Sequence, residues 1–248
     1  LYNFVDNLVP GKLGHIYAAH LARINFGIRR SAAIGSIVFQ RTLDAWIVLS
    51  VAVLAAWALL STQLPDSVLW VLIGGSVIAS ASTLVMLIVL FLDKSLQNRI
   101  PKKIVEIIHA FRKGMWPHGN EMPPIIGLTA IIWILETLWI YFLAHGFGLT
   151  FMTREVLFVT MIPLLASAFP LTPSGGGIVE LTMFSCLRFV GVSAPLAGSI
   201  TLLNRFIDYW LHIVLGVLMW RFRGRMGLRT WREISESRDA SAVRRFNP

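Results

Sequence analysis

Two copies of one charged pattern, Arg-x-x-Asp-x-Trp, lie within apolar stretches of the chain. The arginines are Arg41 and Arg205, and the acidic members are Asp44 and Asp208. An arginine can hold a phosphate through two parallel hydrogen bonds, and a charge inside an apolar segment is costly unless it is used or paired. We therefore expect the two arginines to bind an anionic head group, with the aspartates as supporting ion-pair partners. A structural role, in which the pairs lock neighbouring helices, is an equally good interpretation.

A helix-breaking stretch, Phe-Pro-Leu-Thr-Pro-Ser-Gly-Gly-Gly-Ile-Val-Glu over residues 169–180, precedes the second copy. Its prolines and glycines cannot continue a helix, yet apolar residues flank it on both sides. Irregular backbone at membrane depth is tolerated only where it is buried in protein or lines a cavity. The free N–H groups of the triple glycine, at the start of a short helix, would suit a lipid phosphate. A surface loop between two spans is the alternative.

Composition indicates an integral membrane protein made of helices. Of the 248 residues, 56% are hydrophobic and only 14% are charged, which is too apolar for an ordinary soluble domain. The apolar runs have helical length, which favours a bundle over a barrel. The net charge of +9 collects beside the apolar runs, so it indicates membrane orientation and not nucleic-acid binding. The single cysteine, Cys186, leaves the redox compartment open.

The apolar pattern predicts about four full spans and several shorter helices. Short helices flank the breakers, and Glu136 lies near the middle of the third span, where it is a candidate for proton coupling or for hydrogen bonding to a neighbouring helix. A basic amphipathic helix over about residues 101–114 is expected on the membrane surface. We predict a membrane domain over 1–220 and a basic cytoplasmic tail over 221–248. The predicted spans are 31–61, 68–92, 125–144 and 195–220.

The two charged patterns belong to a longer internal repeat. Arg205 follows Arg41 at an offset of 164, Pro173 follows Pro10 at 163, and Gly191 follows Gly27 at 164. Repeat one covers about residues 3–61 and repeat two about 166–220. If both breakers form re-entrant hairpins, the number of crossings between the copies makes the repeats inverted, a build typical of transporters. The arginines and the open glycine amides are then expected to meet near the bilayer midplane.

The basic residues predict the orientation. Most lie on one side in this topology, in the loop over 94–121 and in the tail, whereas the opposite side carries little beyond Arg154 and Arg188. By the positive-inside tendency the basic side is cytoplasmic. We therefore expect a multi-pass protein of the cell inner membrane with this loop and the tail in the cytoplasm.

The stretch Pro-Ser-Gly-Gly-Gly-Ile-Val-Glu at 173–180, followed by Gly-Val at 191–192 and Asn-Arg at 204–205, resembles the transmembrane region of the lysylphosphatidylglycerol synthase family, its flippase-like portion. The resemblance covers nearly the whole chain. It implies further spans before Leu1 and movement of an aminoacylated or other anionic-headgroup lipid between leaflets. In the first motif the family usually has an acidic residue where this chain has His15, and often an arginine where it has Ala18.

The leading hypothesis is a flippase-like protein that binds a phospholipid or polyprenyl-phosphate head group. One alternative is a non-transporting subunit of a larger membrane complex; another, weaker one is a membrane enzyme acting on a lipid-linked substrate. Histidine spacing shows no metal site and no nucleotide or hydrolase fingerprint occurs, so we expect no metal, cofactor or enzymatic activity. Membrane-protein partners or a homo-oligomer are open expectations. The predicted head-group site consists of Arg41, Arg205, Ser174, Gly175, Gly176, Gly177 and Glu180, with Asp44 and Asp208 as ion-pair partners and Glu136 as the coupling candidate.

Overall fold

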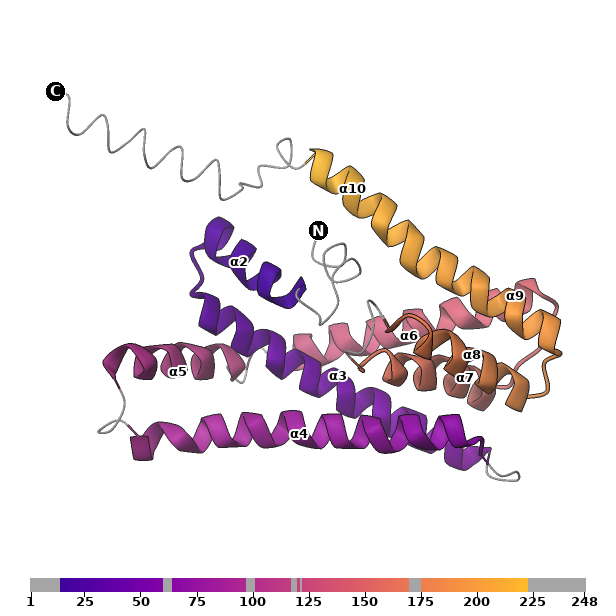
Figure 1. Cartoon of the computed structure of the whole chain (residues 1–248), viewed down its shortest axis with the longest axis horizontal. Helices are drawn as coiled ribbons and strands as arrows, with labels where there is room; N and C mark the ends of the chain where they lie inside the picture. Colours follow the sequence, from indigo (N-terminus) through magenta and orange to yellow (C-terminus); the bar gives the residue numbers. More distant parts are fainter. Residues whose placement is uncertain are drawn as a thin grey trace.

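The structure, a computed structural model, describes residues 14–59, 64–96, 101–116, 120, 122–169 and 175–222. These residues form helices and contain no strand, so the all-α prediction is confirmed. Figure 1 shows the long helices running back and forth along one direction. The helices are α2 (Gly14–Phe26), α3 (Arg30–Ala58), α4 (Asp66–Leu96), α5 (Lys102–Met115), α6 (Met122–Gly146), α7 (Thr153–Ala166), α8 (Ile178–Phe189), α9 (Ala194–Arg205), the π-helical turn η3 (Phe206–Leu211) and α10 (His212–Phe222).

Four helical stretches are long and apolar enough to cross a membrane, in agreement with the sequence prediction. They lie in α3, α4 and α6, and in the continuous run from α9 to α10, and each has 25 to 29 residues. At 1.5 Å per residue such lengths exceed the roughly 30 Å hydrocarbon core of a bilayer. The described part of the chain is therefore a multi-pass membrane bundle.

Helices α7 and α8 are too short to span a bilayer, with 14 and 12 residues. They pack against each other and lie at the end of the molecule where α6 ends and α9 begins (Figure 1). The tip between them, residues 170–174, lies outside the described residues, so the re-entrant hairpin stays a prediction.

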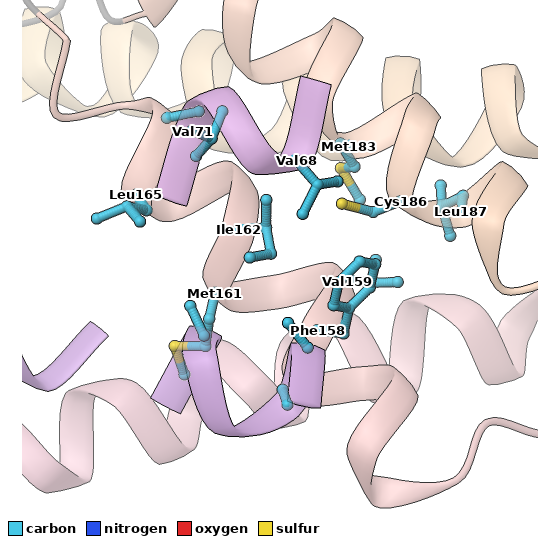
Figure 2. Close-up of a cluster of buried hydrophobic side chains, with 14 of the residues drawn as sticks. Val68, Val71, Phe158, Val159, Met161, Ile162, Leu165, Met183, Cys186 and Leu187 are labelled. Carbon is cyan, nitrogen blue, oxygen red and sulfur yellow. The ribbon is translucent and has the colours of Figure 1, made fainter. Parts of the chain in front are cut away.

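Helix α7 forms the centre of the apolar core. Figure 2 shows its side chains Phe158, Ile162 and Leu165 in one cluster with Val68 and Val71 of α4 and Met183, Cys186 and Leu187 of α8. Two glycines of α4 permit this packing, because a Cβ on Gly74 would lie 2.3 Å from the Phe169 ring and a Cβ on Gly75 would lie 2.5 Å from Leu165. Side chains at either position would push α4 away from the end of α7.

The starts of two long helices have the spacing of the predicted repeat. Helix α3 begins at Arg30 and the run from α9 to α10 begins at Ala194, which differ by the offset of 164 found between the charged patterns. The later run contains a π-helical turn, whereas α3 is α-helical from Arg30 to Ala58. The first breaker, around Pro10, lies outside the described residues, so the full inverted repeat stays a prediction.

Helix α5, the predicted basic surface helix, packs closely on the start of α3. A Cβ on Gly35 would lie 2.1 Å from the carbonyl oxygen of Phe111, and one on Gly114 would lie 1.9 Å from that of Ala32. Two glycines thus let the backbones of α3 and α5 touch. The position of α5 relative to the membrane surface stays a prediction, and the predicted tail lies outside the described residues from 223 onward.

Candidate functional site

A cavity of about 360 Å³ lies between α6, α7, α8, α9 and η3, and we call it the α9 cavity. Most of its wall is apolar, but charged and amide side chains from three of these elements also line it. Such a mixture inside candidate spans is unusual, since ionisable groups at membrane depth are costly. The polar side chains that line it include Glu136, Asn204, Arg205, Asp208 and His212.

Arg205 forms an ion pair with Glu180 of α8, with 2.7 Å between Nε and Oε1. The two side chains are 16% and 27% exposed, so the pair is largely shielded. The arginine also lies over the ring of Tyr209, with Cζ 4.8 Å from the ring centroid, which adds a cation–π attraction. This charge-assisted contact joins the start of α8 to the end of α9.

Glu180 also caps helix α8. Its second oxygen, Oε2, accepts the backbone N–H of Gly177 at 2.7 Å, as in the reciprocal caps at helix N-termini. Glu180 is a predicted head-group residue, and in the structure its carboxylate caps α8. The Gly177 N–H that we expected to face a phosphate is therefore donated to this carboxylate.

The glycine turn before α8 is only partly buried, because Gly177 is exposed. Gly175 has φ of +70° and Gly177 of +87°, values that favour glycine. Gly175 is buried, and a Cβ there would lie 2.7 Å from a Val179 methyl group. Gly176 is half-buried, and Ser174, the other predicted residue of this turn, lies outside the described residues.

Asp208 lies within η3, where the helix widens just after Arg205. Its carboxylate is 3.8 Å from the His212 ring nitrogen Nδ1, and Glu136 of α6 lines the same cavity. The structure pairs Arg205 with Glu180, on another helix, and the predicted ion pair of Arg205 with Asp208 stays a prediction. Single π-helical turns are frequent at functional sites.

A second cavity, of about 480 Å³, lies on the other side of α7, and we call it the α3 cavity. Arg41 and Asp44 line it, and Arg41 Nη1 is 3.8 Å from the Asp44 carboxylate. Arg41 also donates from Nε to His15 Nε2 of α2 at 2.9 Å. Each predicted arginine thus contacts the short helix that precedes it, Arg41 through His15 and Arg205 through Glu180.

The structure does not bring the two arginines together as expected. Arg41 lines the α3 cavity and Arg205 lines the α9 cavity. Both cavities share Leu164 and Ser167 at the end of α7, so this turn forms the wall between them. The physical reason is that α7 fills the centre of the bundle, where the sequence argument had placed an open site.

Sequence reasoning missed several polar residues of the two cavities. Trp139 donates its indole N–H to Asn204 Oδ1 at 2.9 Å and so links α6 to α9. The indole nitrogen of Trp133, which lines the α3 cavity, is buried and has no hydrogen-bond partner among the described residues. Asn204 directly precedes Arg205, so its position in the sequence motif could have marked it as a site residue. The chain has nine tryptophans, and nothing in the sequence distinguishes Trp133 and Trp139 from the others.

The part of the chain that the structure describes contains no group of three or more His, Cys, Asp or Glu side chains able to hold a metal ion. The polar residues of the two cavities are instead arginines, carboxylates, amides and hydroxyls. These groups can bind a phosphate, an ammonium group or an ester by hydrogen bonds and ion pairs.

Comparison with known proteins gives consistent relatives. The family described as lysylphosphatidylglycerol synthase TM region matches residues 1–216. A UPF0104 membrane protein from Methanocaldococcus jannaschii is 27% identical over 220 residues, which cover 87% of this chain and 92% of that protein. One from Methanothermobacter thermautotrophicus is 26% identical over 123 residues, which cover 48% of this chain and 36% of that protein. No solved structure matches.

Proposed function

Because the chain belongs to the lysylphosphatidylglycerol synthase transmembrane region family, we propose that it binds the head group of an anionic phospholipid or polyprenyl phosphate in the α9 cavity and moves that lipid between leaflets. The observation that carries the proposal is the Arg205–Glu180 pair at a broken helix, inside a cavity bounded by candidate spans. The proposed role is binding and translocation, with no covalent chemistry.

The charges of the cavity support a head-group site. A phosphate can compete with Glu180 for the guanidinium of Arg205, because it is also negatively charged and its oxygens can accept two parallel hydrogen bonds from an arginine. Glu136 and Asp208 line the same cavity and would hold an ammonium group if the head group carries one. Placing these ionisable side chains inside apolar helices costs free energy, which a ligand contact offsets.

The α3 cavity is the proposed second position of the head group. Arg41 would hold the phosphate there, and the wall formed by Leu164 and Ser167 would have to move for the lipid to pass. The α7 end has two features that permit such movement: Pro163 lies inside the helix and weakens its hydrogen bonding, and Gly175 follows the turn. We place the end of the molecule that carries α5 in the cytoplasm of the cell, following its basic residues.

A leaflet-accessibility assay on the reconstituted full chain tests the proposal. Fluorescent phosphatidylglycerol is placed in proteoliposomes, and a membrane-impermeant reductant reports how fast inner-leaflet lipid reaches the outside. We expect Arg205→Gln to slow this exposure at least tenfold, as the loss of a charge-assisted bond predicts. Ser199→Ala, on the exposed side of the same helix, is the matched control and should keep the wild-type rate.

Equal rates in the wild type, in Arg205→Gln and in empty vesicles would refute translocation. That result would favour the non-transporting subunit, since such a protein has no reason to accelerate lipid exchange. Co-purification of the wild-type chain with a stoichiometric membrane partner would then be the expected companion result.

A further inference from the structure

A third cavity, of about 530 Å³, lies at the end of the molecule where α3 begins, between α4 and α5. We call it the α5 cavity, and its lining is Leu90, His109, Arg112, Lys113 and Trp116. None of these residues lines the α3 or α9 cavity, so it is a separate site. Two of its five side chains are permanent cations at neutral pH, and no acidic side chain is among them.

The helix that carries most of the α5 cavity lining is packed tightly against α3. The close glycine contacts at Gly35 and Gly114 fix α5 against α3, and Met115 beside them is fully buried. The backbone N–H of Trp116 donates to the Arg112 carbonyl at 3.2 Å and so closes the last turn of α5. The basic side chains are therefore carried by a packed helix end.

An apolar surface continues from the cavity along α4. Leu87, Ile88 and Phe91, on the α4 turn that holds Leu90, are 41%, 45% and 75% exposed. In a candidate span such side chains face acyl chains. The indole of Trp116, 56% exposed, is the side chain that favours the boundary between head groups and acyl chains.

We propose that the α5 cavity binds the phosphate of an anionic phospholipid whose acyl chains lie against the end of α4. Arg112 supplies a fork of N–H donors, Lys113 a mobile positive charge, and Trp116 an indole beside the glycerol backbone. A free phosphate would satisfy the cations but would leave the apolar surface of α4 without a partner. The adjoining surface therefore favours a lipid, and the site does not depend on the proposed translocation.

Native mass spectrometry of the detergent-solubilised full chain tests this site. Phosphatidylglycerol and phosphatidylcholine with identical acyl chains are titrated separately. Each basic residue near an anionic lipid contributes about 1 kcal/mol, or about fivefold in affinity, so Arg112→Gln/Lys113→Gln should weaken phosphatidylglycerol binding by about 25-fold and leave phosphatidylcholine binding unchanged. Lys113→Gln alone, at an exposed position, should weaken it about fivefold without risk to folding.

The matched control is Arg23→Gln/Arg29→Gln, which removes two exposed charges near the same end of the molecule. This control should bind phosphatidylglycerol as the wild type does. An equal loss in the control would mean general charge attraction and would overturn the site, as would full binding by the Arg112/Lys113 variant. Water-soluble glycerol phosphate should compete poorly; competition at the same concentration as the lipid would overturn the assignment to a lipid.

Discussion

Replacing Glu180 by Gln separates a structural role of the Arg205–Glu180 pair from a ligand-binding role. Glutamine keeps an oxygen that can accept the Gly177 N–H, so the cap of α8 can persist, but the negative charge 2.7 Å from Arg205 is lost. The arginine is then left in the cavity without its carboxylate. A structural pair and a ligand site respond to this change in opposite directions.

The magnitude of the loss follows from the burial of the pair. Breaking a fully buried ion pair by removing one partner costs about 3–5 kcal/mol, whereas an exposed pair is worth about 0–1 kcal/mol. Side chains that are 16% and 27% exposed lie between these limits, and we expect Glu180→Gln to cost about 2 kcal/mol. The corresponding fall in Tm is about 4–8 °C for a chain of this size.

Ligand binding should change in the other direction. If a lipid phosphate competes with Glu180 for Arg205, removing the competitor should strengthen phosphatidylglycerol binding several-fold while the apo protein becomes less stable. Thermal denaturation in detergent, with and without added phosphatidylglycerol, measures both effects at once. The lipid should raise the Tm of Glu180→Gln more than that of the wild type, and the Tm of Arg205→Gln less than that of the wild type, since the α5 cavity remains in all three proteins.

The reasoning fails if Glu180→Gln and Arg205→Gln are equally destabilised and show the same change of Tm with lipid. That pattern would show a pair that only joins α8 to α9. Glu155→Gln, which changes the corresponding cap carboxylate of α7 outside the α9 cavity, serves as the control.

Three further predictions follow from contacts in the bundle. Gly114→Ala places a Cβ 1.9 Å from an α3 carbonyl oxygen and should cost about 1–3 kcal/mol in thermal denaturation, whereas Gly127→Ala, with nothing within 4 Å of its Cβ, should gain up to about 1 kcal/mol. Burial, and secondly repulsion from Arg30 and Arg23, lowers the pKa of His20 in α2, a helix that is not a candidate span. Because the neutral ring contacts Arg30 of α3, the docking of α2 on α3 should be complete above about pH 6.5 and should weaken as the pH falls below that value. Hydrogen exchange of the α2 amides measures this dependence, and His20→Gln should remove it. Leu164→Trp should thicken the wall between the cavities and slow lipid exposure in proteoliposomes while phosphatidylglycerol binding by mass spectrometry is kept.

Sequence patterns predicted the elements better than their contacts. Apolar runs of helical length located all four candidate spans, because helix length in a bilayer is set by its thickness. The last span was predicted to begin at residue 195, and α9 begins at Ala194. Apolar runs and helix starts depend on neighbouring residues along the chain, so they can be predicted from a single sequence.

The site could be predicted only in part, because its geometry depends on tertiary packing. The sequence identified Arg205 and Glu180 as site residues but did not pair them, since they lie on different helices. It placed Asp208 beside Arg205 by assuming a regular helix, whereas the helix widens into a π turn at Phe206. It could not show that α7 would separate Arg41 from Arg205, because apolar side chains of a short helix do not reveal which neighbours they will meet.

The central position of α7 constrains the order in which the protein can assemble. Helices α3 and α4 leave the ribosome before α7, yet both pack against it. Val48 and Ala52 of α3 and Val68 of α4 belong to a cluster that α7 completes. A nascent chain halted before Thr153 would therefore hold α3 and α4 without the helix that completes their shared cluster, and burial of this cluster should be detectable only after α7 has been made.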